Sequence, residues 1–461
     1  MSPGLVEATP QKQPGALYLL FSTEAWERFS YYGMRAILVL YMTKALLINN
    51  EHVSKGTASL LYGCYTGLVY LTPLLGGFLA DRFLGYRRSI LIGGFIMAMG
   101  QFLLSAPAVP CFFAGLLCLI IGNGFFKPNI STIVGTLYEE GDPRRDRGFT
   151  IFYMGINLGA MFSPIVCGQL LAENPVLGDQ GYAWGFRAAG IGMLIGLTTF
   201  FFGQRMLGSK GLAPRQVAAK VVPGDQAKGY RPEPQIETER ELSRPLTDIE
   251  RKRVLCLGLI GIVMVFFWMA FEQAGNSMTL FADERIDRNA FGWTMSASFF
   301  QFVNPTFILL VAPLISWVWK VTAARGMEPS TPAKMVLGLT FLSLGFVPLL
   351  AASGLAGTTG RASWVWLILT YFLHTIGELC LSPVGLSLVT KLAPKKYAAL
   401  LMGGWFIPVF LGNFLAGATG FLYPSLPHTQ FFTIFVVTSL AAAGVLLAVL
   451  KPLKGLMGGV H

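Results

Sequence analysis

Long apolar segments, separated by short polar loops, make up most of the chain. A membrane-spanning helix needs about 20 mainly apolar residues to cross a hydrocarbon core of about 30 Å. Several of the segments exceed about 25 residues, which predicts helices that are tilted or that extend beyond the bilayer. The pattern predicts twelve spanning helices, near residues 16–48, 56–80, 88–106, 110–138, 148–173, 183–206, 254–282, 291–320, 334–353, 362–393, 398–424 and 429–451.

One polar stretch, residues 207–253, divides these helices into two sets of six, and it is too polar to span a membrane. The composition agrees with a membrane protein, because 13% of the residues are charged against roughly 25% in soluble domains. We therefore expect an all-α membrane protein. Its parts would be an N-terminal tail (1–15), a six-helix bundle (16–206), a linker (207–253), a second six-helix bundle (254–451) and a C-terminal tail (452–461).

Lys and Arg are concentrated in the tails and in the loops that follow even-numbered helices. The loops after helices 2, 4 and 10 contain Arg82, Arg87, Arg88, Arg144, Arg145, Arg147, Lys391, Lys395 and Lys396. Since cytoplasmic loops carry an excess of these residues, we expect both termini and the linker to be cytoplasmic. The net charge of +11 is then the sum of this bias over many loops, and it requires no nucleic-acid partner.

Charged residues interrupt the first apolar segment. Glu24, Glu27 and Arg28 share one face of a helix, and Tyr31 and Arg35 continue that face. A charged side chain near the bilayer centre costs about 2.5–3.5 kcal/mol on insertion scales, so such residues face protein or water and serve a function. The charged face indicates a protein that moves a charged solute across a membrane.

The two halves repeat each other in their charges and in their prolines. Helices 1 and 7 both carry glutamates, and helices 4 and 10 carry Lys127 and Glu378. Matched interruptions in the two halves predict a binding site between them and alternating access by rocking. A single proline is also common in membrane helices without any such role. The matched mid-segment prolines are Pro73 with Pro305, Pro128 with Pro383, and Pro164 with Pro408.

The ionisable residues inside the predicted helices leave one negative charge in excess. They are the cations Arg28, Arg35 and Lys127 and the carboxylates Glu24, Glu27, Glu272 and Glu378. Because a site of low dielectric constant penalises net charge, binding of one proton would balance the set. This suggests a transporter driven by a proton gradient, without a cofactor. A static ion-pair network that holds the helices together is the alternative.

The distribution of these charges suggests the ligand. Cations lie in the N-terminal half and isolated carboxylates in the C-terminal half, so a ligand with a carboxylate and an ammonium group would bridge them. Aromatic walls with a few polar groups suit variable side chains that are held between constant ends. The candidate residues are Tyr31, Tyr32, Tyr70, Trp268, Trp405, Phe406, Asn157 and Asn304.

Motifs of other function classes do not occur in the sequence. There is no GxxxxGK[ST] run for ATP hydrolysis, no GxSxG or HExxH run for a hydrolase, and no repeat of like charges for a channel. The cysteines occur singly, and His374, one turn before Glu378, is by itself a weak indication of a metal. We expect neither enzyme activity nor a metal site.

Five motifs follow one another along almost the whole chain. They are Glu24–Gly33 (ExxERFxYYG), Gly76–Gly85 (GGFLADRFLG), Phe149–Ala160 (FTIFYMGINLGA), Phe267–Gln273 (FWMAFEQ) and Gly377–Pro383 (GELCLSP). In order and spacing they resemble the bacterial proton-coupled oligopeptide transporters of the major facilitator superfamily. The resemblance implies the major facilitator fold, a location in the cell membrane and proton-driven symport of di- and tripeptides, and we expect a monomer.

The resemblance also implies which residues bind the peptide. Arg35 and Lys127 would attract its carboxylate, and Glu378, with Asn157 and Asn304, would bind its amino end. The remaining residues of the implied peptide-binding set are Tyr31, Tyr32, Tyr70, Trp268, Ser382 and Trp405.

A second implied set couples protons and gates the site. Glu24, Glu27 and Arg28 would exchange partners with Lys127. Glu272 would pair with Arg35 as an outer gate that opens when the glutamate is protonated. Exchange of ion-pair partners costs less free energy than loss of a partner, because removing one member of a buried pair leaves the other charge uncompensated. Asp81 and Arg82, at the cytoplasmic end of helix 2, would form a latch that stabilises the outward-open state.

The chain departs from the family pattern at two places. Many bacterial members carry two further helices between the halves, and animal members use a histidine in helix 2. Residues 207–253 are too polar for such helices, and helix 2 has no histidine. Proton transfer should then rest on carboxylates. Plant relatives that carry nitrate or other anions offer an alternative function, which Glu378 and the two asparagines disfavour.

Overall fold

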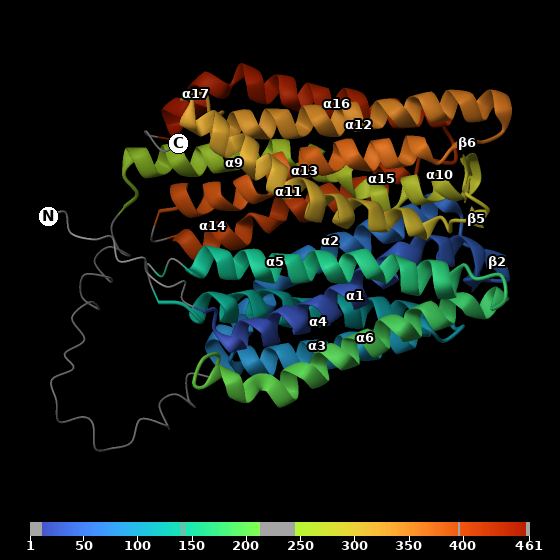
Figure 1. Cartoon of the computed structure of the whole chain (residues 1–461), viewed down its shortest axis with the longest axis horizontal. Helices are drawn as coiled ribbons and strands as arrows, with labels where there is room; N and C mark the ends of the chain where they lie inside the picture. The colour runs from blue at the N-terminus through green and yellow to red at the C-terminus, as the bar shows by residue number, and fades with distance from the viewer. Residues whose placement is uncertain (1–11, 140–141, 143, 213–244, 395–396, 458–461) are drawn as a thin grey trace, which may run out of the picture.

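The computed structural model describes residues 12–139, 142, 144–212, 245–394 and 397–457. Long helices run nearly parallel to one another along the longest axis of the molecule (Figure 1). Helices of the N-terminal half, blue to green, lie below those of the C-terminal half, yellow to red, in this view. The two halves of the chain therefore occupy separate sides of the molecule.

The described residues of the N-terminal half form α1 (Gly15–Lys44), α2 (Lys55–Leu79) with the π-helix η1 (Ala80–Leu84), α3 (Tyr86–Leu104), α4 (Val109–Thr136), α5 (Arg144–Ser163) with the π-helix η2 (Pro164–Ala172), η3 (Gly178–Gln180), α6 (Gly181–Gly203) and η4 (Gln204–Leu207). Those of the C-terminal half form α9 (Asp248–Phe271), η6 (Glu272–Gly275), α10 (Ser277–Arg285), η7 (Ser298–Phe302), α11 (Val303–Ala324), α12 (Thr331–Thr359), α13 (Val365–Leu392), α14 (Ala398–Gly404), α15 (Phe406–Gly420), α16 (His428–Ala448) and α17 (Leu450–Leu456).

The spanning helices agree in number with the sequence prediction. Within the described residues, eleven helical stretches are long and apolar enough to cross a membrane. Helix α1 falls outside that count because of its charges, but its 30 residues make it about 45 Å long. Counting α1, the described residues contain the twelve expected helices. Exposed apolar side chains such as Phe95, Leu117 and Leu310 fit a surface covered by lipid.

Helix α9 begins inside the segment that the sequence assigns to the linker. It starts at Asp248, before the expected first residue 254. Thr247 accepts a hydrogen bond from the Glu250 backbone N–H, and the Glu250 side chain accepts one from the Thr247 N–H. This capping box satisfies two backbone donors at the helix start, so the polar first turn is helical. Most of the expected linker, residues 213–244, lies outside the described residues.

Matched prolines coincide with matched irregularities in helices 5 and 11. Pro164 begins the π-helix η2, and Pro408 follows the break at Trp405 between α14 and α15. A proline lacks a backbone N–H and crowds the preceding turn, which disturbs the helix at these points. The other matched prolines lie inside or at the start of α2, α4, α11 and α13.

The two ends of the molecule differ. At one end, here called the strand end, short strands pair: β1 (Leu47–Ile48) with β2 (Glu51–His52), β3 (Ile286–Asp287) with β6 (Ala362–Ser363), and β4 (Asn289–Ala290) with β5 (Trp293–Thr294) (Figure 1). At the opposite, terminal end, Gln13 donates to the Arg144 carbonyl and Arg253 donates to the Met457 carbonyl. The starts of α1, α5 and α9 and the end of α17 thus share the terminal end. That this end faces the cytoplasm stays a prediction.

Candidate functional site

A cavity of about 290 Å³ lies between the two halves. Its walls come from α1, α2, α4 and α5 on one side and from α9, η6, α11, α13 and the α14–α15 junction on the other. Most of the site residues proposed from the sequence line this cavity. They are Arg28, Tyr32, Arg35, Tyr70, Lys127, Asn157, Trp268, Glu272, Asn304, Glu378, Ser382 and Trp405.

The charged face of α1 is packed inside the N-terminal half. Arg28 Nε lies 3.0 Å from Glu24 Oε1 and also pairs with Glu27. The three side chains are almost completely buried. Within the described residues, Glu24 Oε2 and Arg28 Nη2 have no hydrogen-bond partner. Of the three, only Arg28 reaches the cavity, while both glutamates lie behind it.

Arg35 connects the two halves. Its Nη2 donates to Glu272 Oε2 at 2.6 Å, and its Nε donates to the Tyr62 hydroxyl at 2.6 Å. Glu272 is the first residue of η6, where the regular part of α9 ends. A side chain at Gly275 would overlap the Tyr62 hydroxyl, so this close approach requires a glycine. The pair joins α1 to η6, and its role as a gate stays a prediction.

Lys127 and Glu378 face the cavity from opposite halves. Lys127 Nζ lies 4.0 Å from the centre of the Tyr70 ring, a cation–π contact. Within the described residues, neither Lys127 nor Glu378 forms an ion pair. Asn304 donates to Glu378 Oε2 at 2.9 Å. Each side of the cavity therefore presents a charge that has no ion-pair partner among the described residues.

Three further residues proposed from the sequence, Tyr31, Asp81 and Arg82, also lie outside the cavity. Tyr31 is buried behind the wall, with its ring edge-on to Tyr32. Asp81 and Arg82 are exposed in η1 at the terminal end, and Arg82 lies over the Phe83 ring. Within the described residues, neither takes part in an ion pair. Among the residues that the structure describes, the latch proposed for them has no partner charge in this conformation, and its role stays a prediction.

The cavity also contains residues that the sequence analysis did not propose. Tyr153 and Gln301 line it. Tyr153 is one turn before Asn157, and Gln301 is one turn before Asn304, so helical spacing could have suggested both. Tyr62, the second partner of Arg35, had no distinguishing signal among the tyrosines of its helix.

The two halves are held together at the strand end, whereas a second hollow lies towards the terminal end. A second hollow, between the first turns of α5 and the last turns of α13, shares Tyr153 with the cavity. At the strand end, by contrast, ion pairs cross between the halves: Arg35 with Glu272, Lys44 with Asp283, and Lys55 with Glu284. The structure is therefore closed at the strand end.

Known proteins share this sequence and this fold. The sequence model of the POT family matches residues 87–223 and 235–448. The peptide transporter YePEPT of Yersinia enterocolitica subsp. palearctica serotype O:3 is 34% identical over 97% of this chain and 96% of its own length. A di-/tripeptide transporter of Lactococcus lactis subsp. cremoris is 32% identical, over 97% of both chains.

The structural similarity is equally extensive. The crystal structure of a POT family transporter in complex with 5-aminolevulinic acid has a TM-score of 0.83 to this structure. The two chains are 32% identical, and the match covers 96% of this chain and 97% of the other. The twelve helices and the cavity between the halves are therefore those of a multi-pass membrane transporter, and this chain belongs to the POT family.

Proposed function

We propose that this chain is a proton-driven symporter that carries di- and tripeptides into the cell by alternating access. The observation that supports this most strongly is that Lys127 and Glu378 face one cavity from opposite halves. A ligand with a carboxylate at one end and an ammonium group at the other can satisfy both charges. The 5-aminolevulinic acid named for the related structure also carries an amino group and a carboxylate.

The remaining walls favour short peptides of varied sequence. The cavity volume of about 290 Å³ is at the lower end of the range for ligand pockets. Tyr32, Tyr70, Trp268 and Trp405 supply ring surfaces that contact apolar groups without demanding one shape. The charged ends, which are the same in every peptide, would form ion pairs with Lys127 and Glu378. The variable peptide side chains would pack against these rings.

Proton coupling would act on the pair that joins the halves. Protonation of Glu272 removes its charge and weakens its bond to Arg35, so the strand end can open. A buried Arg35 without an ion-pair partner would be costly in free energy. Its hydrogen bond to the Tyr62 hydroxyl and a new ion pair with the peptide carboxylate would offset that cost. On α1, Glu24 Oε2 has no hydrogen-bond partner among the described residues. It could therefore take part in an exchange of partners among Glu24, Glu27, Arg28 and Lys127.

Transport of nitrate or a similar anion is the alternative on the same fold, and Glu378 opposes it. Its carboxylate lines the cavity and, within the described residues, has no paired cation. An anion without an ammonium group would meet an uncompensated negative charge there, which disfavours it as a substrate.

An uptake experiment tests the proposal. Purified protein in liposomes should accumulate labelled dialanine when the interior is made more alkaline than the medium. The accumulation should collapse when an ionophore dissipates the pH gradient. Uptake that ignores the gradient would contradict proton coupling, and uptake of nitrate but not of dialanine would contradict peptide transport.

A further inference from the structure

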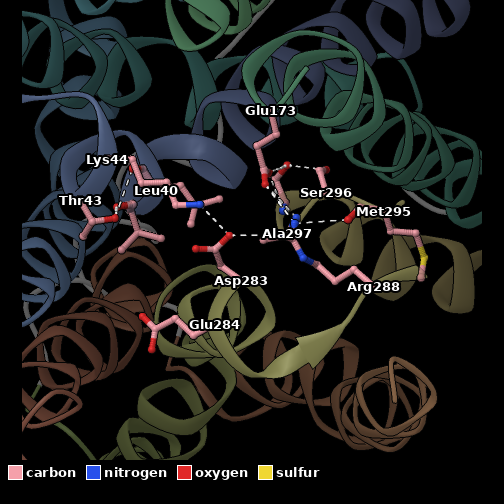
Figure 2. Close-up of polar contacts among 12 residues, drawn as sticks. Leu40, Thr43, Lys44, Glu173, Asp283, Glu284, Arg288, Met295, Ser296 and Ala297 are labelled. Atoms are coloured by element: carbon pink, nitrogen blue, oxygen red, sulfur yellow. Dashed lines mark hydrogen bonds and ion pairs between the residues drawn. The ribbon is translucent and has the colours of Figure 1, made fainter. Parts of the chain in front are cut away.

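The carboxylate of Glu173 caps a cavity helix of the opposite half. Glu173, in the N-terminal half, directly follows η2 as its C-cap residue. Its Oε1 accepts hydrogen bonds from the Ser298 N–H at 2.9 Å and from the Ser298 hydroxyl at 2.5 Å. Its Oε2 accepts one from the Ala297 N–H at 2.9 Å. Figure 2 shows Glu173 reaching the start of η7, which leads into α11.

Glu173 accepts hydrogen bonds from two of the backbone donors at the start of this helix. The first N–H groups of any helix have no partner inside the helix. Ser296 satisfies one locally, because its hydroxyl accepts from the Phe299 N–H at 3.1 Å. The N–H groups of Ala297 and Ser298 bond to Glu173 instead. A negative charge is also favoured at the positive end of the helix dipole.

Three further charged residues form a chain of alternating sign that starts at Glu173. Arg288 Nη1 lies 3.5 Å from Glu173 Oε2, and Arg288 Nη2 lies 3.4 Å from Asp283 Oδ1. Asp283 Oδ1 in turn lies 2.6 Å from Lys44 Nζ (Figure 2). The Glu173 side chain is only 9% exposed. This chain of charges, here called the strand-end cluster, crosses twice between the halves.

Opening the strand end requires these bonds to break. A side chain at Gly168 would overlap the Ser298 hydroxyl, so η2 and η7 are in close contact. Helix α11 carries Asn304, which bonds Glu378 in the cavity, and Gln301 of η7 also lines the cavity. The position of η7 against η2 is thereby linked to the position of two cavity residues.

We propose that Glu173 is a positioning residue that holds the start of α11 against the N-terminal half and so stabilises the conformation closed at the strand end. The proposal deepens the function proposed above, because it presupposes alternating access. It concerns a contact outside the cavity, separate from the Arg35–Glu272 pair. Loss of the contact should populate the conformation open at the strand end.

Spin-label distances across the strand end test the proposal without any transport measurement. Val176 in the N-terminal half and Phe291 in the C-terminal half are 91% and 100% exposed. Cysteines placed at these two positions, in a background without the native cysteines, would carry the labels. We expect Glu173→Gln to raise the ratio of long to short distances about tenfold, as for loss of hydrogen bonds to a charged group.

Matched variants separate this effect from a general loss of structure. Glu328→Gln removes an ion pair with Lys334 that lies within one half, and it should leave the distances unchanged. Ser298→Ala should shift the distances in the same direction as Glu173→Gln, and the double variant should match Glu173→Gln alone. If Glu173→Gln does not fold, Ser298→Ala and Glu173→Asp supply the same test.

Unchanged distances in Glu173→Gln, or fully additive shifts in the double variant, would overturn the proposal. A distance shift in a protein that fails to take up dialanine would support the positioning role of Glu173 and reject the proposed function. The two proposals can therefore fail independently.

Discussion

Arg35 of α1 donates to Glu272 of η6 at 2.6 Å, and this buried ion pair joins the two halves of the transporter beside the cavity. Removal of one partner from a buried pair leaves the other charge uncompensated, at a cost of about 3–5 kcal/mol. A transporter can use such a contact only if a proton or a ligand replaces the lost partner. The pair is therefore the point at which peptide binding and proton binding are expected to meet.

Glu272→Gln should abolish gradient-driven uptake while sparing part of the peptide exchange. The amide cannot take up or release the proton, but it can still accept a hydrogen bond from Arg35. Accumulation of labelled dialanine against a pH gradient should be compared with exchange at equal pH. Glu328→Gln, at an exposed pair with Lys334, is the control. An equal loss of both activities in Glu272→Gln would mean that this carboxylate only holds structure.

Glu27→Gln should remove the dependence of uptake on external pH. Glu27 is completely buried and pairs with Arg28, which would still contact Glu24 at 3.0 Å. The remaining pair should preserve the fold, whereas the partner exchange that we propose for proton transfer would lose one member. Initial uptake rates at several external pH values measure this. A variant whose rates rise with acidity as steeply as those of the parent would exclude Glu27 from coupling.

Gly275→Ala should destabilise the protein, because the added methyl group would overlap the Tyr62 hydroxyl and approach Arg35 Nε to 3.0 Å. Overpacking of this kind costs about 1–3 kcal/mol. The melting temperature in detergent should fall by several degrees. Gly354→Ala is the matched control, since nothing lies within 4 Å of a side chain at that helical position. Equal melting temperatures for the two variants would contradict the packing described around Arg35.

Much of the architecture could be predicted from the sequence, because hydrophobic length determines where a chain can cross a bilayer. The charged residues of helices 1, 4, 7 and 10 were also expected to lie on one central site, and Lys127 and Glu378 indeed line one cavity. Because burial of a charge against lipid is costly, charged residues in membrane helices face the interior of the protein or a water-filled cavity.

The contacts between distant segments could not be predicted in the same way. Glu173 and Ser298 are 125 residues apart, and each looks like an ordinary polar residue near a helix end. Tyr62 and Arg35 lie on neighbouring helices of one half, and Gly275 of the other half packs against both side chains. The contacts of Glu173 with Ser298 and of Gly275 with Tyr62 join the two halves, so they depend on the conformation closed at the strand end. Hydropathy and helical spacing report on single helices and carry no information about that state.

Competition by end-blocked peptides tests most directly whether Lys127 and Glu378 hold a peptide by its two ends. Uptake of labelled dialanine would be competed by dialanine, N-acetyl-dialanine and dialanine amide in the parent, Lys127→Gln and Glu378→Gln proteins. We predict that Glu378→Gln lowers the affinity for the free peptide and for the amide about tenfold or more but barely changes the affinity for the N-acetyl peptide. Lys127→Gln should lower the affinity for the free and N-acetyl peptides and leave the affinity for the amide unchanged. A uniform loss of affinity for all three peptides in both variants would contradict this assignment.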